Sequence, residues 1–447
     1  MTRTLAVWWD GVIVGALQVN QHGEMRFAYS PEWLADPSLP AISFSLPKRP
    51  EPFRQRQCRP FFAGLLPEAS QRDAIAGVLG ISTRNDFAFL EALGGDVAGA
   101  LSLWPEGDVP PVPNPGGDPR SLSDDELVGV LDTLPTRPLL AGREGLRLSL
   151  AGAQTKLPVV LVDNRVALPA PGQPTTHILK PPVVRFPHTT ENEALVMTLV
   201  AAVGLPAAPV VARTVAGRPY LLITRYDRRF DESGHAHRLH QEDFCQALGV
   251  PPERKYASED GPTFKTSFDL LREATTIPAI AVLAFLDAAI FNVIVGNADA
   301  HGKNFSLLYQ AGTVSLAPFY DVLSTVAYPD LSAKLAMKIA KRATLEEIDS
   351  KIWQTFAEDI GLAGSFVRRR VEELAEAVVA QAPSIPESLA LAGLDAAALR
   401  QYSAIIVSRA ERVARTGVAP AAPSRVSHPT KRLTTKARAR KKKGGPG

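Results

Sequence analysis

A short polar loop, residues 296–306, carries the side chains of this sequence that are best suited to chemistry. It reads GNADAHGKNFS and directly follows the most apolar run of the chain. Asp299 and Asn304 have four residues between them. Kinase catalytic loops have this spacing, and in them the aspartate accepts the proton of the attacking hydroxyl while the asparagine binds magnesium. Asp321, the last residue of the string FYD, stands where a second magnesium ligand is expected. The pattern predicts phosphoryl transfer and needs neither zinc nor a thiol nucleophile.

The apolar run before this loop predicts a helix that packs inside the protein. Residues 277–295 approach the length of a membrane span, but Pro278, Asp287 and Asn292 interrupt them. An aspartate in the middle of a span costs about 2.5–3.5 kcal/mol even on a scale that is lenient to charges. We therefore expect a buried core helix and no association with a membrane.

A predicted strand at residues 176–180 ends on Lys180. This lysine is similar to the one on kinase strand β3 that holds the α- and β-phosphates. The helix predicted after it begins near Thr190 and contains Glu193. Glu193 could pair with Lys180, as the αC glutamate of kinases does, or it could form a capping box with Thr190 at the start of its own helix. The sequence leaves both alternatives open.

Hydrophobic periodicity predicts the remaining elements. Three histidines at 235, 237 and 240 lack the partners and spacing of a metal site, so we expect a solvated loop there. Strands are expected within an antiparallel sheet at 1–30, at 157–162 and at 220–228, and helices at 121–134, 241–248, 345–360, 367–380 and 394–413.

Composition limits the class of protein. The chain has 447 residues, 45% of them hydrophobic, and only two cysteines, Cys58 and Cys245, without a CxxC pair. A reducing, cytoplasmic location is expected, since there is no disulfide framework and no apolar leader at the start. The net charge of +3 is unevenly distributed, because residues 418–447 form a basic tail with nine Lys or Arg and no Asp or Glu. We expect this tail to be disordered.

Six short strings together resemble the HipA family of bacterial toxin kinases, over roughly residues 1 to 415. They are FFAGLLPE (61–68), GGDVAGAL (94–101), LSLAGAQTKLPV (148–159), HILKPP (177–182), RLHQEDFCQALGV (238–250) and the polar loop GNADAHGKNFS. The resemblance implies an α+β, two-lobed protein-kinase-like fold with a small β-rich accessory subdomain at the amino terminus and an all-helical carboxyl-terminal lobe. The boundaries expected are 1–104 for the subdomain, 105–119 for a Pro/Gly-rich linker, 120–227 and 228–417 for the lobes, and 418–447 for the tail.

The same resemblance implies the cofactors ATP and Mg²⁺ and the residues that bind them. The backbone at Thr224 and Tyr226 would meet adenine, Asp227 would meet the ribose, and Ser149 would be an autophosphorylation site that switches the enzyme off. Asn304 and Asp321 would hold the metal, and Asp299 would be the catalytic residue. The expected nucleotide-binding residues are Ala151, Gly152, Ala153, Gln154, Thr155, Lys156, Lys180, Thr224, Tyr226, Asp227, Gln241, His301, Lys303, Asn304, Tyr320 and Asp321.

The resemblance also implies partners: a helix-turn-helix antitoxin dimer, operator DNA reached through that antitoxin, and a protein substrate such as an aminoacyl-tRNA synthetase. The order G-x-x-D-x-H-x-x-N is similar to the loop of lipid kinases, so a lipid or small-molecule kinase is an alternative. A second alternative is a catalytically silent, kinase-shaped co-regulator of a DNA-binding antitoxin. The intact set of Asp299, Asn304, Asp321 and Lys180 speaks against it.

Overall fold

An antiparallel sheet of five strands begins the chain, as the alternation in residues 1–30 predicts. The structure is a computed structural model that describes residues 2–111 and 119–417. Leu5, Leu17 and Phe27 point from neighbouring strands into one core. The strands are β1 (Arg3–Trp9), β2 (Val12–Val19), β3 (Met25–Tyr29), β4 (Phe53–Arg54) and β5 (Leu101–Pro105), in the order β4-β3-β2-β1-β5. The helices of this amino-terminal region (residues 2–105) are α1 (Pro31–Ala35), α2 (Gln55–Gly64), α3 (Ala69–Leu79) and α4 (Asp86–Leu93).

A second antiparallel sheet, with the order β10-β11-β9-β7-β8-β6, carries Lys180 at the end of one of its inner strands. Its strands are β6 (Arg120–Ser121), β7 (Leu157–Val162), β8 (Arg165–Leu168), β9 (His177–Lys180), β10 (Val210–Val215) and β11 (Arg218–Thr224), and its helices are α5 (Asp124–Thr133), η1 (Pro138–Leu140) and α6 (Thr189–Ala202). The capping box at Thr190, one of the two alternatives left open for Glu193, is not formed. Helix α6 begins one residue earlier, after His188, and no side chain caps it.

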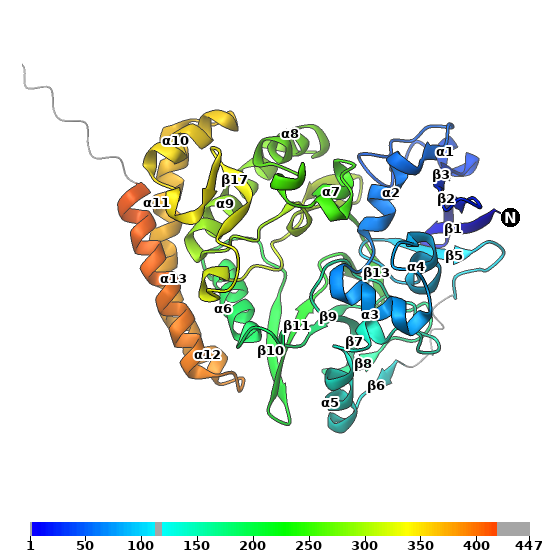
Figure 1. Ribbon diagram of the computed structural model, residues 1–447, viewed down its shortest axis with the longest axis horizontal. Helices are drawn as coiled ribbons and strands as arrows, with labels where there is room; N and C mark the ends of the chain where they lie inside the picture. The colour runs from blue at the N-terminus through cyan, green and yellow to red at the C-terminus, as the bar shows by residue number, and fades with distance from the viewer. Residues whose placement is uncertain (1, 112–118, 418–447) are drawn as a thin grey trace, which may run out of the picture.

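Helices dominate the rest of the chain. They are α7 (Phe244–Ala247), α8 (Phe264–Ala274), α9 (Pro278–Val295), α10 (Ser350–Asp359), α11 (Gly364–Gln381), α12 (Ile385–Ala390) and α13 (Ala396–Gly417), with short 3₁₀ turns η2 (Pro252–Arg254), η3 (Ala257–Glu259), η4 (Gly302–Asn304), η5 (Thr325–Ala327), η6 (Leu345–Glu347) and η7 (Ala382–Ser384). Figure 1 shows α10, α11 and α13 at the opposite end of the molecule from the amino-terminal region, whereas α7 lies beside α2.

The prediction of an all-helical carboxyl-terminal lobe is wrong. The region also contains β12 (Arg228–Phe230), β13 (Ala236–Arg238), β14 (His240–Asp243), β15 (Ser306–Gln310), β16 (Thr313–Leu316), β17 (Lys334–Ile339) and β18 (Arg342–Thr344). These strands are short and partly exposed, so none shows a long alternating pattern. Gln241 lies in β14 rather than in the helix predicted at 241–248. That helix starts after Asp243, whose side chain accepts a hydrogen bond from the Gln246 N–H.

Helix α9 is a core element, as its sequence predicts. Within the described ranges it is the one helix long and apolar enough to cross a membrane, yet it packs inside the protein. Leu286 and Ile290 have no exposed surface, and each such side chain contributes about 1.5–3 kcal/mol through burial. Asp287, which breaks the apolar run, pairs with Arg370 at 2.7 Å. Gly296 ends the helix in the left-handed conformation and so delivers the chain into the polar loop.

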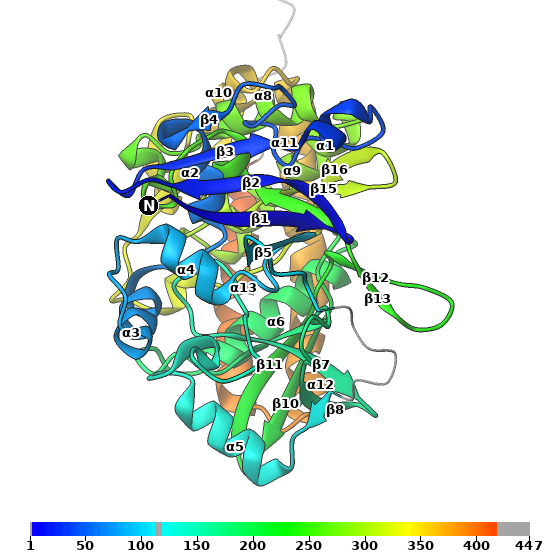
Figure 2. The same cartoon turned by 90° about the vertical axis from the view of Figure 1, so that its right-hand side faces the viewer.

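A buried cluster of charges joins the amino-terminal region to the rest of the protein. Asp96 accepts hydrogen bonds from Arg225 (3.2 Å), Arg228 (2.9 Å) and Arg238 (3.0 Å). Asp227 pairs with Arg225 at 2.8 Å. The three arginines hold the pKa of Asp96 well below its ordinary value although burial opposes them. Figure 2 shows the molecule from another side, with β1 to β3 in the upper half and β7, β8, β10 and β11 of the second sheet in the lower half.

Two predictions fall largely or wholly outside the described residues. They are the linker, of which 112–118 is not described, and the basic tail at 418–447.

Candidate active site

A cavity of about 730 Å³ lies where the second sheet, the helical part and the amino-terminal region meet. It gathers almost every residue that the sequence singled out. The predicted residues that line it are Ala151, Gly152, Ala153, Gln154, Lys156, Lys180, Thr224, Tyr226, Asp227, Gln241, Asp299, His301, Lys303, Asn304, Tyr320 and Asp321.

The Lys180 ammonium bridges two carboxylates in this cavity. It donates to Glu193 Oε1 at 2.7 Å and to Asp321 Oδ1 at 2.6 Å. Lys180 and Glu193 are both buried. Burial raises the pKa of Glu193 and would lower that of Lys180, but the two carboxylates hold the lysine pKa above its ordinary value. Of the two alternatives for Glu193, the structure therefore shows the ion pair with Lys180 and not the helix cap.

The polar loop holds Asp299 through its backbone. Asn297 bonds to Asn292 in α9 and accepts a hydrogen bond from the Asp299 N–H. The Asp299 side chain is open to solvent in the cavity. Burial of the carboxylate among the other residues of the cavity wall nevertheless raises its pKa, against the opposing effect of Lys255. A carboxylate with a raised pKa is a better proton acceptor, which suits a general base.

Asn304 and Asp321 lie in contact in the cavity, and the Asn304 Oδ1 accepts a hydrogen bond from the His301 N–H at 3.1 Å. The Asn304 Nδ2 donates to Asp321 Oδ2 at 3.1 Å. Asp321 is held in the left-handed backbone region, with φ 59°, and strain of this kind gathers at functional sites. Lys180 and Lys156 keep the pKa of Asp321 well below its ordinary value against the effect of burial. One carboxylate and one amide oxygen fit magnesium, which completes its shell with water and substrate phosphates.

The loop at 151–156 brings a further cation into the cavity. The Lys156 ammonium donates to the Ala151 carbonyl at 2.7 Å, and burial, with Lys180 adding repulsion, lowers its pKa to about 8. Gly152 has φ 107°, and a Cβ there would lie 2.9 Å from the Lys156 ammonium. The position thus requires glycine. Lys156 forms no ion pair with a carboxylate of residues 2–111 or 119–417, and a phosphate group would supply that anion.

Several predicted residues occupy other settings than expected. Thr155 does not line the cavity, and its hydroxyl accepts a hydrogen bond from Gln71 at 2.8 Å, so its role in nucleotide binding stays a prediction. The ammonium of Lys303 is held by Asp243 (2.6 Å) and the Gly64 carbonyl (3.1 Å). Burial lowers the pKa of His301 to about 3, so its ring is neutral at pH 7.

The predicted adenine and ribose contacts are partly taken up by the protein itself. The Thr224 N–H donates to the Pro209 carbonyl at 2.8 Å. The Asp227 carboxylate accepts from Arg225 and from the Gly99 N–H. The Tyr226 ring lies 5.5 Å from that of Tyr320, and its hydroxyl bonds to Gln241.

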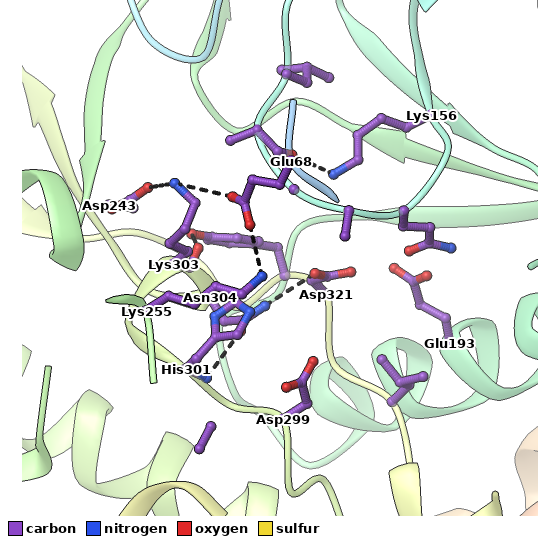
Figure 3. Close-up of a pocket in the computed structure, with 18 of the residues that line it drawn as sticks. Glu68, Lys156, Glu193, Asp243, Lys255, Asp299, His301, Lys303, Asn304 and Asp321 are labelled. Atoms are coloured by element: carbon purple, nitrogen blue, oxygen red, sulfur yellow. Dashed lines mark hydrogen bonds and ion pairs between the residues drawn. The ribbon is translucent and has the colours of Figure 1, made fainter. Parts of the chain in front are cut away.

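The cavity is also lined by four residues that the sequence patterns did not single out: Glu68, Asp243, Lys255 and Tyr256. Glu68 comes from the amino-terminal region, yet its carboxylate lies 2.8 Å from the Lys255 ammonium and 3.7 Å from that of Lys303. Figure 3 shows Glu68 reaching between these two lysines beside the polar loop. The available signal was an isolated acid at the end of the apolar string FFAGLLPE. Its partners are more than 180 residues away, so no local pattern pointed to them.

Two family sequence models match the chain. The HipA N-terminal domain matches residues 5–104, and the HipA-like C-terminal domain matches residues 148–383. Both matches contain residues that line the cavity.

Known relatives extend over most of the chain. Y4mE of Sinorhizobium fredii, whose name assigns it provisionally as a kinase, is 57% identical over 92% of this chain and 98% of its own. The serine/threonine-protein kinase toxin HipA of Shewanella oneidensis is 28% identical over 79% of this chain and 83% of its own. The solved complex of Shewanella oneidensis HipA with HipB and operator DNA matches with a TM-score of 0.78 and 26% identity, covering 92% of this chain and 97% of that one.

Proposed function

This chain belongs to the HipA family of kinases, and on that premise we propose that it is an ATP- and magnesium-dependent protein serine/threonine kinase. The observation that carries the proposal is the Lys180 ammonium, which touches Glu193 and Asp321 in the cavity that also holds Asp299 and Asn304. A kinase needs these groups together: a phosphate-binding lysine with its glutamate, metal ligands, and a base.

In the proposed reaction, Lys180 and Lys156 hold the phosphates of ATP. Asp299 orients the acceptor hydroxyl and accepts its proton, while the loop at 151–156 covers the phosphates. Asn304 and Asp321 would hold magnesium, which supplies neutralisation of the charge on the phosphates when bound. Apolar residues of the second sheet, Ile178 and Ile223, also line the cavity and would suit a nucleobase.

Transfer of labelled phosphate from ATP to protein tests the proposal. Asp299→Asn should lower the rate by about 10²- to 10⁴-fold, because it removes the base, and should leave ATP affinity nearly unchanged. Asp330→Asn is the matched control, since Asp330 is exposed and does not line the cavity. Transfer by the Asp299→Asn protein at the wild-type rate would refute the mechanism.

We extend the proposal to a toxin of a toxin–antitoxin pair. Support comes from the Shewanella oneidensis relative, which was solved with HipB and its operator DNA. The partners would be a helix-turn-helix antitoxin dimer, operator DNA through that antitoxin, and a protein substrate such as an aminoacyl-tRNA synthetase. Ser149 would be the autophosphorylated residue. Phosphoproteomics after brief expression, comparing wild type with Asp299→Asn, would identify the substrate.

A further inference from the structure

A segment of the amino-terminal region, residues 64–71, lies against the phosphate-binding loop. Pro67 forms a parallel bridge with Gly152, and the Glu68 N–H donates to the Gly152 carbonyl at 3.1 Å. The Ser149 hydroxyl donates to the Leu65 carbonyl at 2.8 Å. The segment therefore holds the loop that would cover the nucleotide at Gly152 and just before it, at Ser149.

The side chain of Glu68 continues from this segment to the opposite wall of the cavity. Its carboxylate accepts a hydrogen bond from Lys255 at 2.8 Å and lies 3.7 Å from Lys303. The side chains of Glu68 and Lys255 are each only 15% exposed. Burial would raise the pKa of Glu68, but the two lysines lower it, so the carboxylate is ionised at neutral pH. Glu68 is thus a fixed anion between two cations.

Lys255 stands beside the proposed catalytic base. Both side chains line the cavity, and Lys255 has the largest of the effects that oppose burial in setting the pKa of Asp299. Lys255 already has an anion in Glu68. Its ammonium is therefore kept near Asp299 without being bonded to it. Without Glu68, Lys255 could form an ion pair with Asp299, and Asp299 would then be less available to accept a proton.

We propose that Glu68 is a positioning residue for phosphoryl transfer, which acts by holding Lys255 away from Asp299 and toward the transferred group. The inference rests on the proposed kinase function. It means that the amino-terminal region completes the active site rather than only flanking it. A preorganised cation near developing negative charge stabilises a transition state because it needs no rearrangement during the reaction.

The test is Glu68→Gln, which keeps the shape and removes the charge. The expected result is a fall in kcat of roughly ten- to a hundredfold, typical for the loss of a group that orients a functional one, with a smaller change in the KM for ATP. The acidic limb of the pH–rate profile should move to lower pH, because Asp299 gains Lys255 as a partner and loses a nearby anion. In a Lys255→Met background, Glu68→Gln should have little further effect.

The matched control is Glu253→Gln. Glu253 pairs with Arg59 at 2.5 Å across the same boundary, but it does not line the cavity. This variant should keep the wild-type kcat and pH profile, which separates loss of a boundary contact from loss of positioning.

A second readout does not depend on activity. Acetylation of Lys255 in the ligand-free protein, followed by mass spectrometry, should be faster in Glu68→Gln than in wild type. If the wild type is active and Glu68→Gln has the same kcat and pH profile, the proposal is overturned. It is also overturned if Lys255 is acetylated equally fast in the two proteins. A wild type that transfers no phosphate would instead refute the proposed function, and faster labelling of Lys255 in the variant would then show that Glu68 still holds it.

Discussion

Replacing Glu193 with glutamine should weaken the binding of magnesium–ATP much more than it lowers the stability of the ligand-free protein. In the ligand-free structure Lys180 has two carboxylate partners, Glu193 at 2.7 Å and Asp321 at 2.6 Å. If Asp321 turns to magnesium, Glu193 becomes the carboxylate that keeps Lys180 in place for the phosphates. The two states therefore depend on Glu193 to different degrees.

The magnitudes follow from the contacts. In the ligand-free protein, the substitution leaves no unpaired charge, because Asp321 still holds Lys180. The substitution also removes a buried carboxylate whose pKa is raised. The change in stability should stay within about 1 kcal/mol. In the bound state the variant loses a hydrogen bond between charged groups, worth about 1.5–3 kcal/mol. This corresponds to an increase in Kd of between about tenfold and about 150-fold.

Calorimetric titration with a magnesium complex of a non-hydrolysable ATP analogue measures the affinity, and thermal melting measures stability. Glu191→Gln is the control, since Glu191 is buried on the same helix but does not line the cavity. A double-mutant cycle with Lys180→Ala isolates the pair. Additive effects in the cycle, or equal losses of stability and affinity, would refute the reasoning.

Two further predictions concern the loop around residues 149–156. Because the pKa of Lys156 is about 8, its ammonium should lose its proton as pH rises from 7 to 9, and the affinity for ATP should fall. Lys156→Met should bind ATP more weakly at pH 7 and should lose this pH dependence. A wild-type affinity that does not change with pH would contradict the role of Lys156. Incubation with ATP should add one phosphate at Ser149, seen by intact mass and absent in Ser149→Ala. The buried Ser149 site has no room for about −1.5 to −2 added charges, so the loop should leave and activity stop; full activity of the phosphorylated protein would exclude this switch.

The sequence predicted best what lies close together along the chain. Asp299 and Asn304 share one loop, and that loop follows a helix whose apolar run is unmistakable. Lys180 ends a regular strand, so its position could also be predicted. In each case a local pattern is enough to place the side chain.

The failures arise where tertiary contacts override local rules. Thr190 and Glu193 have the spacing of a capping box, but a buried ion pair with Lys180 is available to Glu193 and the helix starts earlier. The Thr155 hydroxyl, predicted from its neighbours in the loop to meet the nucleotide, bonds to Gln71 of the amino-terminal region, a contact that no local pattern shows. Glu68 could not be found, because its importance depends on Lys255, which is distant in sequence.

The charge cluster around Asp96 has a consequence for how this gene can be divided. A gene fragment that starts after residue 105 would encode Arg225, Arg228 and Arg238 with Asp227, but without the carboxylate that all three share. Removing one partner of a buried pair costs about 3–5 kcal/mol, so this fragment should fail to fold by itself. Co-expression of the amino-terminal region as a separate peptide should restore solubility, since that peptide returns Asp96 to the arginines. The two halves would then behave as complementing subunits, which associate although they are separate polypeptide chains.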